Sequence, residues 1–350
     1  MKLAEFDYEL PAELIAQRPL PARDASRLLH LEPDGSTHHL GFEDLSGILQ
    51  PDDLLVLNDT KVFPARLVGA RATGGAVELL LLEKLDDGSW RVLGKPARKL
   101  RPASVLTFGG GLLEAEVVEQ SPLRVRFAHA GEWDDIVDSL GKTPLPPYIE
   151  PMDDESQARL RYQTVYARAR GSVAAPTAGL HFTEAVFDAL SRRGVRVAKI
   201  TLHVGHATFA PVRSETISEH SMGIERFEVP PATVEAIRQS RRVVAVGTTT
   251  VRALESAARL DFAAGWHESD LFITPGFEFR VVGGLVTNFH LPKSTLLMLV
   301  SALGGVEAVR AAYREAVKQK YRFYSFGDAM LVYPARHGAP NPPALSNLPV

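Results

Sequence analysis

Histidines and glycines gather at the two ends of one stretch of the chain, residues 171–209. The segment GSVAAPTAGLHFT places His181 close to Gly179, and the segment LHVG places His203 close to Gly205. An unperturbed imidazole titrates near neutral pH, so both histidines are candidates for proton transfer. Hydrogen-bonded packing in a core explains either histidine alone equally well. Their occurrence with glycines at both ends of one unit favours a functional site, because glycine lets a backbone approach a ligand.

A helix and a strand are expected between these two ends. Thr183 is a suitable N-cap, and apolar residues follow it at helical spacing. Residues 195–204 then alternate as a strand, with Lys199 and His203 on one face. That face changes from apolar to polar along the strand, which is typical of a strand whose end enters a site.

Two other predicted strands also end in polar residues. A buried strand over residues 54–57 is followed by Asn58 and Asp59, and open α/β sheets often bind ligands at such carboxyl ends. A simple Asx turn explains these two residues, taken alone, somewhat better. The strand over residues 243–246 is followed by three threonines at a helix N-terminus, Thr248 to Thr250. Capping needs only one threonine, so the group favours a bound phosphate, carboxylate or ribose.

The last polar segment runs from Asn288 to Thr295 and leads into an apolar helix. Lys293 before the N-cap Ser294 resembles half of a phosphate loop, but the glycines of GxxxxGK[ST] are absent, which excludes a Walker A motif. Before this segment, we expect two strands on either side of Gly283-Gly284. A final strand region is expected over residues 321–334.

Composition limits the class of protein. The 350 residues are 45% hydrophobic and 23% charged, as in an ordinary soluble globular protein. The net charge of −3 gives no overall basic field, so an RNA partner would need a local basic patch. With no cysteine, the chain has no disulfide, cysteine-ligated zinc, iron–sulfur cluster or thiol catalysis. No signal core or membrane-spanning apolar run is found, which predicts a cytoplasmic protein.

The pattern of elements predicts a mixed α/β core domain with a small antiparallel β-barrel inserted into it. Short β-rich runs separated by glycine and proline occupy the middle of the chain, with α/β signals on both sides. We therefore predict the core at residues 1–65 and 149–336, the barrel at 66–148, and a disordered tail at 337–350. The densest basic cluster is a connector within the predicted barrel and contains Lys95, Arg98, Lys99 and Arg101. A solvated loop is the usual explanation of such a run; contact with RNA phosphates is the alternative.

The chain resembles one family closely, the S-adenosylmethionine:tRNA ribosyltransferase-isomerases of queuosine biosynthesis. The segments that carry the resemblance extend from residue 5 to about residue 332, in the family's order: YELPAELIAQRPLPARDASRLL, LNDTKVFPARL, LPPYI, RYQTVYA, GSVAAPTAGLHFT, LHVG, GTTTVRALES, LVTNFHLPKSTLLMLVSA and YRFYSFGDAML. So long a set of motifs is specific. The resemblance implies the same fold, an α/β core that carries an inserted barrel.

The resemblance also implies a reaction. S-adenosylmethionine would act as a ribosyl donor to the aminomethyl group of 7-aminomethyl-7-deazaguanine at the wobble position of tRNA. Adenine and methionine would leave, and the sugar would rearrange to give epoxyqueuosine. The family needs no metal or redox cofactor, and the partners implied are the donor and tRNA. We expect a monomer.

The site residues follow from the motifs. His181 and His203 are predicted to transfer protons. The basic cluster is predicted to bind RNA. Substrate-binding residues are predicted at Asn58, Asp59, Arg66, Thr177, Gly179, Lys199, Gly205, Glu225, Thr248, Thr249, Thr250, Arg252, Asn288, His290, Lys293 and Ser294.

The chain departs from the family pattern at three places. His206-Ala207 follows LHVG where a Leu-Gly or similar pair is expected. Gly223 stands where the family usually has a second histidine after HSM, so no imidazole acts from that position here. Gly283 replaces an aspartate that is common in the family, and we interpret this change as structural.

Two functions of other kinds remain possible from the residues. A protein that grips tRNA through its barrel without catalysis would bind tRNA but form no product from S-adenosylmethionine. An ordinary methyltransferase would transfer a labelled methyl group, although the glycine-rich nucleotide turn after the first strand is missing. Neither alternative explains the polar clusters as well as the ribosyltransferase.

Overall fold

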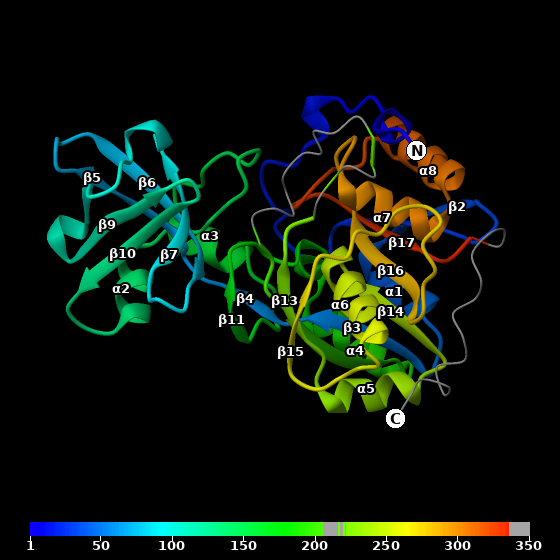
Figure 1. Ribbon diagram of the computed structural model, residues 1–350. Coiled ribbons are helices and arrows are strands. Elements are labelled where there is room, and N and C mark those ends of the chain that lie inside the picture. Colours follow the sequence, from blue (N-terminus) through cyan, green and yellow to red (C-terminus); the bar gives the residue numbers. More distant parts are fainter. Residues whose placement is uncertain (206–215, 218–219, 221, 336–350) are drawn as a thin grey trace.

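The structure, a computed structural model, describes residues 1–205, 216–217, 220 and 222–335. A large mixed sheet with helices and a closed antiparallel barrel lie side by side in Figure 1, which confirms the predicted fold class. The predicted domain boundaries stay a prediction. The predicted disordered tail and the departure at His206-Ala207 lie outside the described residues.

The core domain is built on a nine-stranded sheet. Its strands, in spatial order, are β15 (Trp266–Ser269), β13 (Glu225–Glu228), β12 (Arg196–Leu202), β3 (Asp53–Asn58), β14 (Arg242–Val246), β16 (Val282–Asn288), β17 (Ala329–Val332), β1 (Arg27–Leu31) and β2 (Thr37–Gly41). The four neighbours β12, β3, β14 and β16 run parallel. Their carboxyl ends therefore meet along one edge of the sheet, where open α/β sheets bind ligands.

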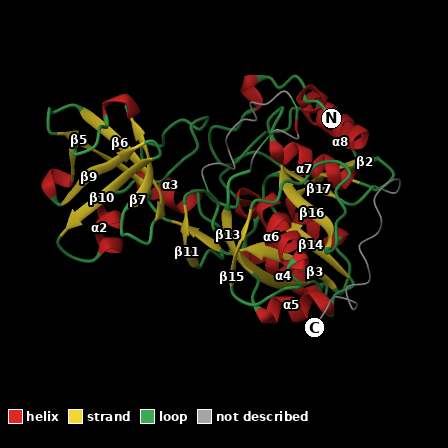
Figure 2. Cartoon of the chain, in the orientation of Figure 1, coloured by secondary structure: helices red, strands yellow, loops and turns green. Residues whose placement is uncertain are grey.

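Side chains of the central strands alternate between the two faces of the sheet, and this produces two hydrophobic cores. In β14, Val243 and Ala245 belong to one core, and Val244 and Val246 belong to the other. The first core includes residues of α5 (Pro231–Arg238), α6 (Thr248–Arg259), α7 (Thr295–Gly304) and α8 (Val306–Lys318). The second includes residues of α1 (Leu45–Ile48) and α4 (Glu184–Arg192). The sheet is thus covered on both faces, as Figure 2 shows, which is why its inner strands are apolar throughout.

Two expectations about strands are wrong. Gly283 and Gly284 lie inside the single strand β16 and do not separate two strands. A Cβ at Gly283 would lie 2.8 Å from Cγ of Arg242, and one at Gly284 would lie 3.0 Å from the ring of Tyr333. The glycines therefore make room for side chains that cross the strand, in agreement with a structural reason for Gly283.

The expected final strand over residues 321–334 is reduced to β17, four residues long. Tyr324 adopts a positive φ of 74°, and the carboxylate of Asp328 accepts the backbone N–H of Arg322 at 2.8 Å. These two features make a turn of the residues before β17. The turn brings polar and aromatic residues to the edge of the sheet.

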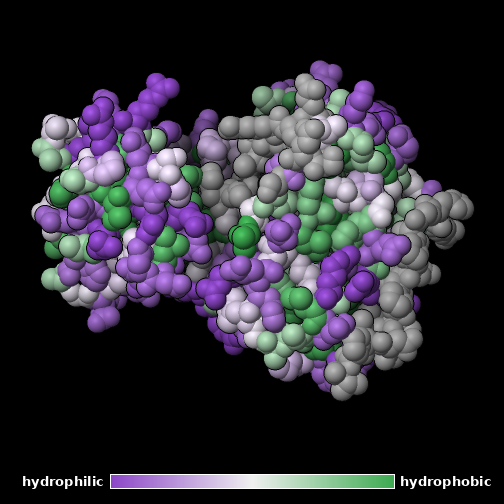
Figure 3. Space-filling view, viewed as in Figure 1, coloured by the Kyte–Doolittle hydropathy of each residue, from purple (hydrophilic) through white to green (hydrophobic). Residues whose placement is uncertain are grey.

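The barrel comprises six strands. In chain order they are β5 (Arg66–Arg71), β6 (Ala76–Lys84), β7 (Trp90–Lys95), β8 (Val105–Phe108), β9 (Leu113–Gln120) and β10 (Leu123–His129). The sheet closes in the order β10-β7-β6-β5-β8-β9 around its own apolar core, to which α2 (Trp133–Leu140) contributes Val137. Figure 3 shows mainly hydrophilic side chains over the face of the barrel in view, with apolar ones scattered between them.

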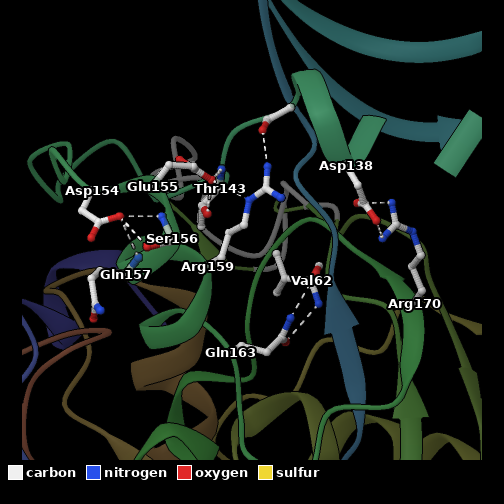
Figure 4. A network of polar contacts seen from close by, with 11 residues as sticks. Val62, Asp138, Thr143, Asp154, Glu155, Ser156, Gln157, Arg159, Gln163 and Arg170 are labelled. Atoms are coloured by element: carbon white, nitrogen blue, oxygen red, sulfur yellow. Dashed lines mark hydrogen bonds and ion pairs between the residues drawn. The ribbon is translucent and has the colours of Figure 1, made fainter. Parts of the chain in front are cut away.

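Short elements connect the two parts or flank the strands. They are α3 (Glu155–Arg161), the paired strands β4 (Thr60–Val62) and β11 (Ala169–Ser172), and the 3₁₀ turns η1 (Leu3–Phe6), η2 (Ala12–Leu14), η3 (Phe42–Asp44), η4 (Ala97–Lys99), η5 (Gly109–Gly111) and η6 (Thr177–His181). Figure 4 shows that Arg170 of β11 points toward Asp138 of α2, and the two side chains form an ion pair at 2.9 Å. Arg159 of α3 donates to the carbonyl of Gly141 at 2.6 Å. Polar contacts therefore hold the barrel against the core domain.

Replacing the buried Glu255 of α6 with alanine is expected to lower the free energy of unfolding by about 3–5 kcal/mol. Its carboxylate, 0% exposed, accepts the backbone N–H groups of Arg280, Val281 and Val282 at 2.9–3.0 Å. Without it, three donors are buried unpaired at the entrance to β16. Urea unfolding measures the loss.

The matched control is Glu307→Ala in α8. The side chain of Glu307 is 79% exposed and pairs with Arg310 in a surface ion pair at 3.3 Å. Exposed pairs of this kind contribute about 0–1 kcal/mol. A loss below about 1 kcal/mol for Glu255→Ala would contradict the stabilising role of its bonds to the three backbone N–H groups.

The described part of the chain contains no single helix that is long and apolar enough to cross a membrane. Helices α7 and α8, which meet at a bend of 116°, reach the length and apolar composition of a membrane span only when they are taken together. Within the same residues, no three His, Cys, Asp or Glu side chains are grouped closely enough to hold a metal ion.

Candidate active site

A hollow of about 470 Å³ lies at the carboxyl ends of β14 and β16. We call it the strand-end hollow. Parts of the chain that are distant in sequence form its wall, and together they supply hydroxyl, amide, imidazole and apolar groups. Its lining residues are Ala175, Pro176, Thr177, Ala178, Val204, Gly247, Thr248, Thr249, Thr287, Asn288, Phe289, His290, Leu296, Tyr324 and Ser325.

The amino end of α6 forms one wall of this hollow. Gly247 adopts a φ of 86°, which turns the chain from β14 directly into the helix. Thr248 and Thr249 line the hollow, whereas Thr250 donates its hydroxyl to the carbonyl of Val246 at 2.6 Å. The first N–H groups of a helix have no partner within it and favour negative charge. This wall therefore suits a carboxylate or a phosphate.

Asn288, the last residue of β16, is the polar centre of another wall. Its Nδ2 donates to the carbonyl of Tyr324 at 3.1 Å and also lies 3.1 Å from Nε2 of His181. A carbonyl oxygen only accepts hydrogen bonds, so the contact with Tyr324 shows which end of the Asn288 side chain is the NH2 group. Its Oδ1 is buried and has no hydrogen-bond partner. The side chain, 2% exposed, thus presents an unused acceptor where a ligand could donate.

His181 lies behind Asn288 at the end of η6. Because Nε2 accepts from Asn288, the proton resides on Nδ1, which donates to Oγ of Ser26 at 2.7 Å. Its ring stacks on Phe42 with 5.0 Å between centroids. Burial, reinforced by the charges of Arg322 and Arg23, lowers the pKa of His181 to about 3. At neutral pH the imidazole is therefore uncharged, with a defined tautomer.

Lowering the pH from 7 to 5 is expected to destabilise the protein through His181 and His290. Burial lowers the pKa of His290 to about 3 as well. The unfolded chain takes up a proton on each imidazole below about pH 6.5, while the folded chain does not until about pH 3. Each histidine therefore reduces the free energy of unfolding by up to about 1.4 kcal/mol per pH unit in that window.

Urea unfolding at pH 7, 6 and 5 measures this slope. In His290→Gln one imidazole is absent, so the slope should decrease by up to about 1.4 kcal/mol per pH unit relative to wild type. His129→Gln, at an exposed position of β10, is the control for the substitution itself and should change the free energy of unfolding at pH 7 by less than about 0.5 kcal/mol. A wild-type stability that does not fall between pH 6 and pH 5 would contradict the buried, neutral state of both rings.

His203 lies just beyond the end of β12. Its Nδ1 lies 2.9 Å from Oγ1 of Thr60, and its ring stacks on Trp266 with 5.1 Å between centroids. Burial, together with the charge of Arg226, lowers its pKa. Neither His203 nor His181 lines the strand-end hollow; His181 lines a neighbouring hollow instead. The two histidines predicted to transfer protons are thus in different surroundings, and their roles stay predictions.

Several of the predicted substrate-binding residues are engaged in the protein's own hydrogen bonds. The amide of Asn58 joins β3 to Leu202 through two bonds of 3.0 Å, and the carboxylate of Asp59 accepts the hydroxyl of Thr201 at 2.7 Å. Glu225 forms a buried ion pair with Arg252 and also accepts the N–H of Gly205. These contacts explain the residues as supports of the strand ends.

Other predicted residues lie away from the strand-end hollow. Lys199 is exposed on β12, and Arg66 pairs with Glu78 in the barrel at 3.3 Å. Lys293 pairs with Asp7 at 2.8 Å, and Ser294 caps α7 by accepting the N–H of Leu297. The structure therefore brings together Thr177, Thr248, Thr249, Asn288 and His290.

Gly179 and the basic cluster occupy positions of other kinds. A Cβ at Gly179 would lie 2.0 Å from the hydroxyl of Tyr166, so the glycine allows η6 to pack closely. The four basic residues are all exposed: Lys95 ends β7, and Arg98, Lys99 and Arg101 lie on the connection between β7 and β8. Their side chains are accessible to a large anionic partner.

The sequence does not predict a second hollow of about 310 Å³, which adjoins the first at Ser325. It is lined by His181, Ser26 and three arginines that the structure brings together: Arg23, Arg161 and Arg322. Arg23 and Arg161 lie in segments where the sequence is rich in arginine, a signal that could have indicated them. Ser325 and Arg322 lie in the segment expected to be a strand, and that expectation gave no reason to place them in a site.

An open α/β sheet with a polar hollow at its carboxyl edge, joined to a closed β-barrel, defines an α/β enzyme with an accessory domain. The model of the family described as "Queuosine biosynthesis protein" matches residues 3–332. The chain belongs to this family and is an enzyme.

The names of similar proteins agree with membership of this family. A protein of Heliobacterium modesticaldum, named S-adenosylmethionine:tRNA ribosyltransferase-isomerase, is 51% identical over 344 residues, with 95% of this chain and 100% of that protein covered. A protein of Anaeromyxobacter sp. (strain Fw109-5) with the same name is 52% identical over 342 residues, with 95% and 99% covered. The crystal structure of S-adenosylmethionine tRNA ribosyltransferase from Thermotoga maritima is similar at 40% identity with a TM-score of 0.53, over 93% of this chain and 99% of that one.

Proposed function

We propose that this enzyme transfers the ribosyl part of S-adenosylmethionine to 7-aminomethyl-7-deazaguanine at the wobble position of tRNA and isomerises it, giving epoxyqueuosine. A bond forms between the aminomethyl nitrogen and a ribosyl carbon, and the bonds from the ribosyl group to adenine and to sulfur break. Adenine, methionine and one proton are released. The family membership and the names of the relatives support this reaction.

The strand-end hollow is the proposed donor site, and one observation carries this assignment: the buried, unused Oδ1 of Asn288 belongs to a hollow between the amino end of α6 and apolar residues. A sulfonium nucleoside has donor groups on adenine and ribose that could reach this oxygen. Its methionine carboxylate suits the N–H groups and hydroxyls at Thr248 and Thr249. Apolar side chains such as Leu296 suit the ring and exclude water.

Proton transfer is needed because the positive sulfur makes the neighbouring C5′ hydrogens acidic, so a base must remove one. We propose His181 as the base: burial keeps its ring uncharged at neutral pH, and Nε2 would release the Asn288 amide in order to take the proton. Protonation helps adenine to leave, and the more accessible His203 is the proposed second participant. S-adenosylmethionine is consumed as a substrate, and no metal or redox cofactor is proposed.

Turnover tests the proposed function. Purified protein, S-adenosylmethionine and tRNA that carries the precursor base should release adenine and methionine in equal amounts, one of each per modified tRNA. The same tRNA without the precursor base is the matched control and should give no release. Absence of adenine release from the modified tRNA, or transfer of a labelled methyl group to it, would defeat the proposal.

We also propose that the enzyme acts in the cytoplasm as a monomer, with tRNA as its macromolecular partner. The exposed basic side chains on the barrel provide positive charge in a protein whose net charge is −3. Light scattering of the purified protein tests the monomer: a mass near 38.2 kDa supports it, and a mass near twice that value contradicts it.

Replacing Lys95, Arg98, Lys99 and Arg101 together with glutamine is expected to weaken tRNA binding about 10-fold or more at low salt. It should also flatten the dependence of log Kd on log salt by about 0.7–0.9 for each phosphate that the variant no longer neutralises. Binding measured between about 50 and 200 mM salt gives both quantities. Arg192→Gln/Arg193→Gln at the exposed end of α4 is the control; an unchanged slope in the fourfold variant would place the RNA elsewhere.

A further inference from the structure

Three guanidinium groups line the second hollow, which we call the arginine hollow. Arg23 comes from the loop before β1, Arg161 from the end of α3, and Arg322 from the turn before β17. His181 also lines this hollow. Segments that lie far apart in the sequence therefore place positive charge beside one buried imidazole.

The guanidinium groups in this hollow are oriented by backbone carbonyls. Arg23 donates to the carbonyls of Leu180 and Leu160, at 3.2 and 2.7 Å, and Arg161 and Arg322 likewise donate to backbone carbonyls. In the part of the chain that the structure describes, none of the three guanidinium groups forms an ion pair with a carboxylate within 4 Å, although the charge of Asp328 acts on Arg322 and favours its charged form. Backbone carbonyls orient an arginine, but they carry no net charge to balance it.

The neighbouring carboxylate, Asp328, is committed elsewhere. It accepts Nε of Arg27 at 3.3 Å and the backbone N–H groups of Arg27 and Arg322. Meanwhile Nε of Arg161 and Nη1 of Arg322 are buried without a hydrogen-bond partner. Unused charged donors in a partly buried hollow are costly unless an anion binds them.

Mutual repulsion supports the same conclusion. Burial lowers the pKa of Arg23, and the charge of Arg161 lowers it further. The charges of Arg322 and Arg23 likewise contribute to the lowered pKa of His181. An anion bound between these groups would relieve the repulsion that they exert on one another.

The place of the arginine hollow indicates which anion it takes. On one side it shares Ser325 with the strand-end hollow. On the other side it shares Arg23 with a groove of about 1180 Å³ between the barrel and the core domain. Lys61, Arg159 and Arg170 line this interdomain groove together with Asp138, the ion-pair partner of Arg170. Arg170 also lies over the ring of Phe63, 5.5 Å from its centroid. Basic side chains next to an aromatic ring are typical of channels for single-stranded nucleic acid.

We propose that the arginine hollow binds a backbone phosphodiester of the RNA, adjacent to the nucleotide that is modified, and that the RNA strand reaches it through the interdomain groove. The inference rests on the proposed function, because it assumes that tRNA is the acceptor. The three arginines hold the phosphate while the target base points past Ser325 toward the strand-end hollow. The guanidinium fork matches phosphate oxygens in geometry, which makes arginine the suitable residue type.

Binding measurements with Arg161→Met and Arg322→Met, each made separately, test the proposal. Both variants should raise the Kd for precursor tRNA about 10- to 100-fold and reduce the salt slope by up to about 0.7, the effect of one phosphate contact on a single strand. The Kd for S-adenosylmethionine should change less than about twofold. Arg322→Lys keeps the charge and should recover part of the tRNA affinity.

Arg196→Met is the matched control. Arg196 also donates to a backbone carbonyl, that of Gln239 at 2.8 Å, but it lies at the amino end of β12, away from the carboxyl edge of the sheet. It should leave both Kd values unchanged. A variant that binds tRNA as wild type does, or that loses S-adenosylmethionine affinity instead, would overturn the inference; the latter result would assign the arginines to the donor carboxylate. Thermal unfolding checks that each variant is folded at the temperature of the assay.

Different results would overturn the proposed function and the phosphate site. If the wild-type protein releases no adenine from precursor tRNA, the proposed function is wrong. If the wild-type protein turns over normally and the Arg161 and Arg322 variants retain its tRNA affinity and salt slope, the function stands and the phosphate site is wrong.

Discussion

Replacing His181 with alanine is expected to lower kcat for adenine release by about 10²- to 10⁴-fold, the range that a positioned acid or base contributes. The imidazole links the two hollows: Nε2 accepts from Asn288 in the strand-end hollow, and Nδ1 donates to Ser26 at the arginine hollow. Its removal takes away a neutral basic group and the ring nitrogen that accepts from the Asn288 amide. Both losses act on the reacting groups.

Stability must be measured in the same variant, because His181 also packs on Phe42. We expect some loss of stability, yet a protein that remains folded at the assay temperature. His39→Ala is the control: His39 bonds the hydroxyl of Tyr321 at 2.8 Å, on the far strand β2. If kcat of His181→Ala falls only in proportion to the fraction unfolded, then His181 is a packing residue.

Asn288→Asp is expected to lower kcat/KM by about 10²- to 10³-fold, although it replaces one amide with a carboxylate of nearly the same shape. The amide of Asn288 donates to the carbonyl of Tyr324 and to His181. A carboxylate donates to neither, so it would face the Tyr324 carbonyl with negative charge. It would also attract a proton to His181 and raise the pKa of that ring above about 3.

Two readouts separate this effect from a general loss of structure. The NMR titration of His181 should move to higher pH in Asn288→Asp, and the Kd for S-adenosylmethionine should rise. Asn288→Ala removes the donor without adding a charge, so it should impair binding but leave the titration of His181 low. Wild-type kcat/KM together with an unchanged titration in Asn288→Asp would contradict the arrangement of these two residues.

Much of the fold could be predicted from the sequence because its signals are local. Apolar runs such as residues 54–57 and 243–246 mark inner strands of a sheet that is covered on both faces. The three threonines after Gly247 mark a helix N-terminus at the carboxyl edge of that sheet. The glycines inside β16 are misleading, since they make room for side chains packed against the strand and do not form a turn.

The candidate site could be predicted only in part, because its geometry depends on contacts between distant segments. Polar residues at strand ends divide into two groups that look alike in the sequence. Asn288 leaves an acceptor unused in the hollow, whereas Asn58 uses both atoms of its amide to hold Leu202. Only the pairing of β3 with β12 creates that difference.

The arginine hollow shows the same limit more strongly. Arg23 and Arg322 lie near opposite ends of the chain, and nothing in their local sequence indicates that they flank one imidazole. The sequence pattern favours an extended Tyr324, but its positive φ creates the turn that places Ser325 between the two hollows. Tertiary packing, which periodicity does not report, makes these residues neighbours.

A crystal structure with S-adenosylmethionine bound is the decisive test of the donor site. We predict that the nucleoside occupies the strand-end hollow, with Oδ1 of Asn288 at hydrogen-bond distance from a donor atom of its adenine or ribose and the carboxylate at Thr248 and Thr249. A nucleoside bound at another place, with Oδ1 of Asn288 still unpaired, would contradict it.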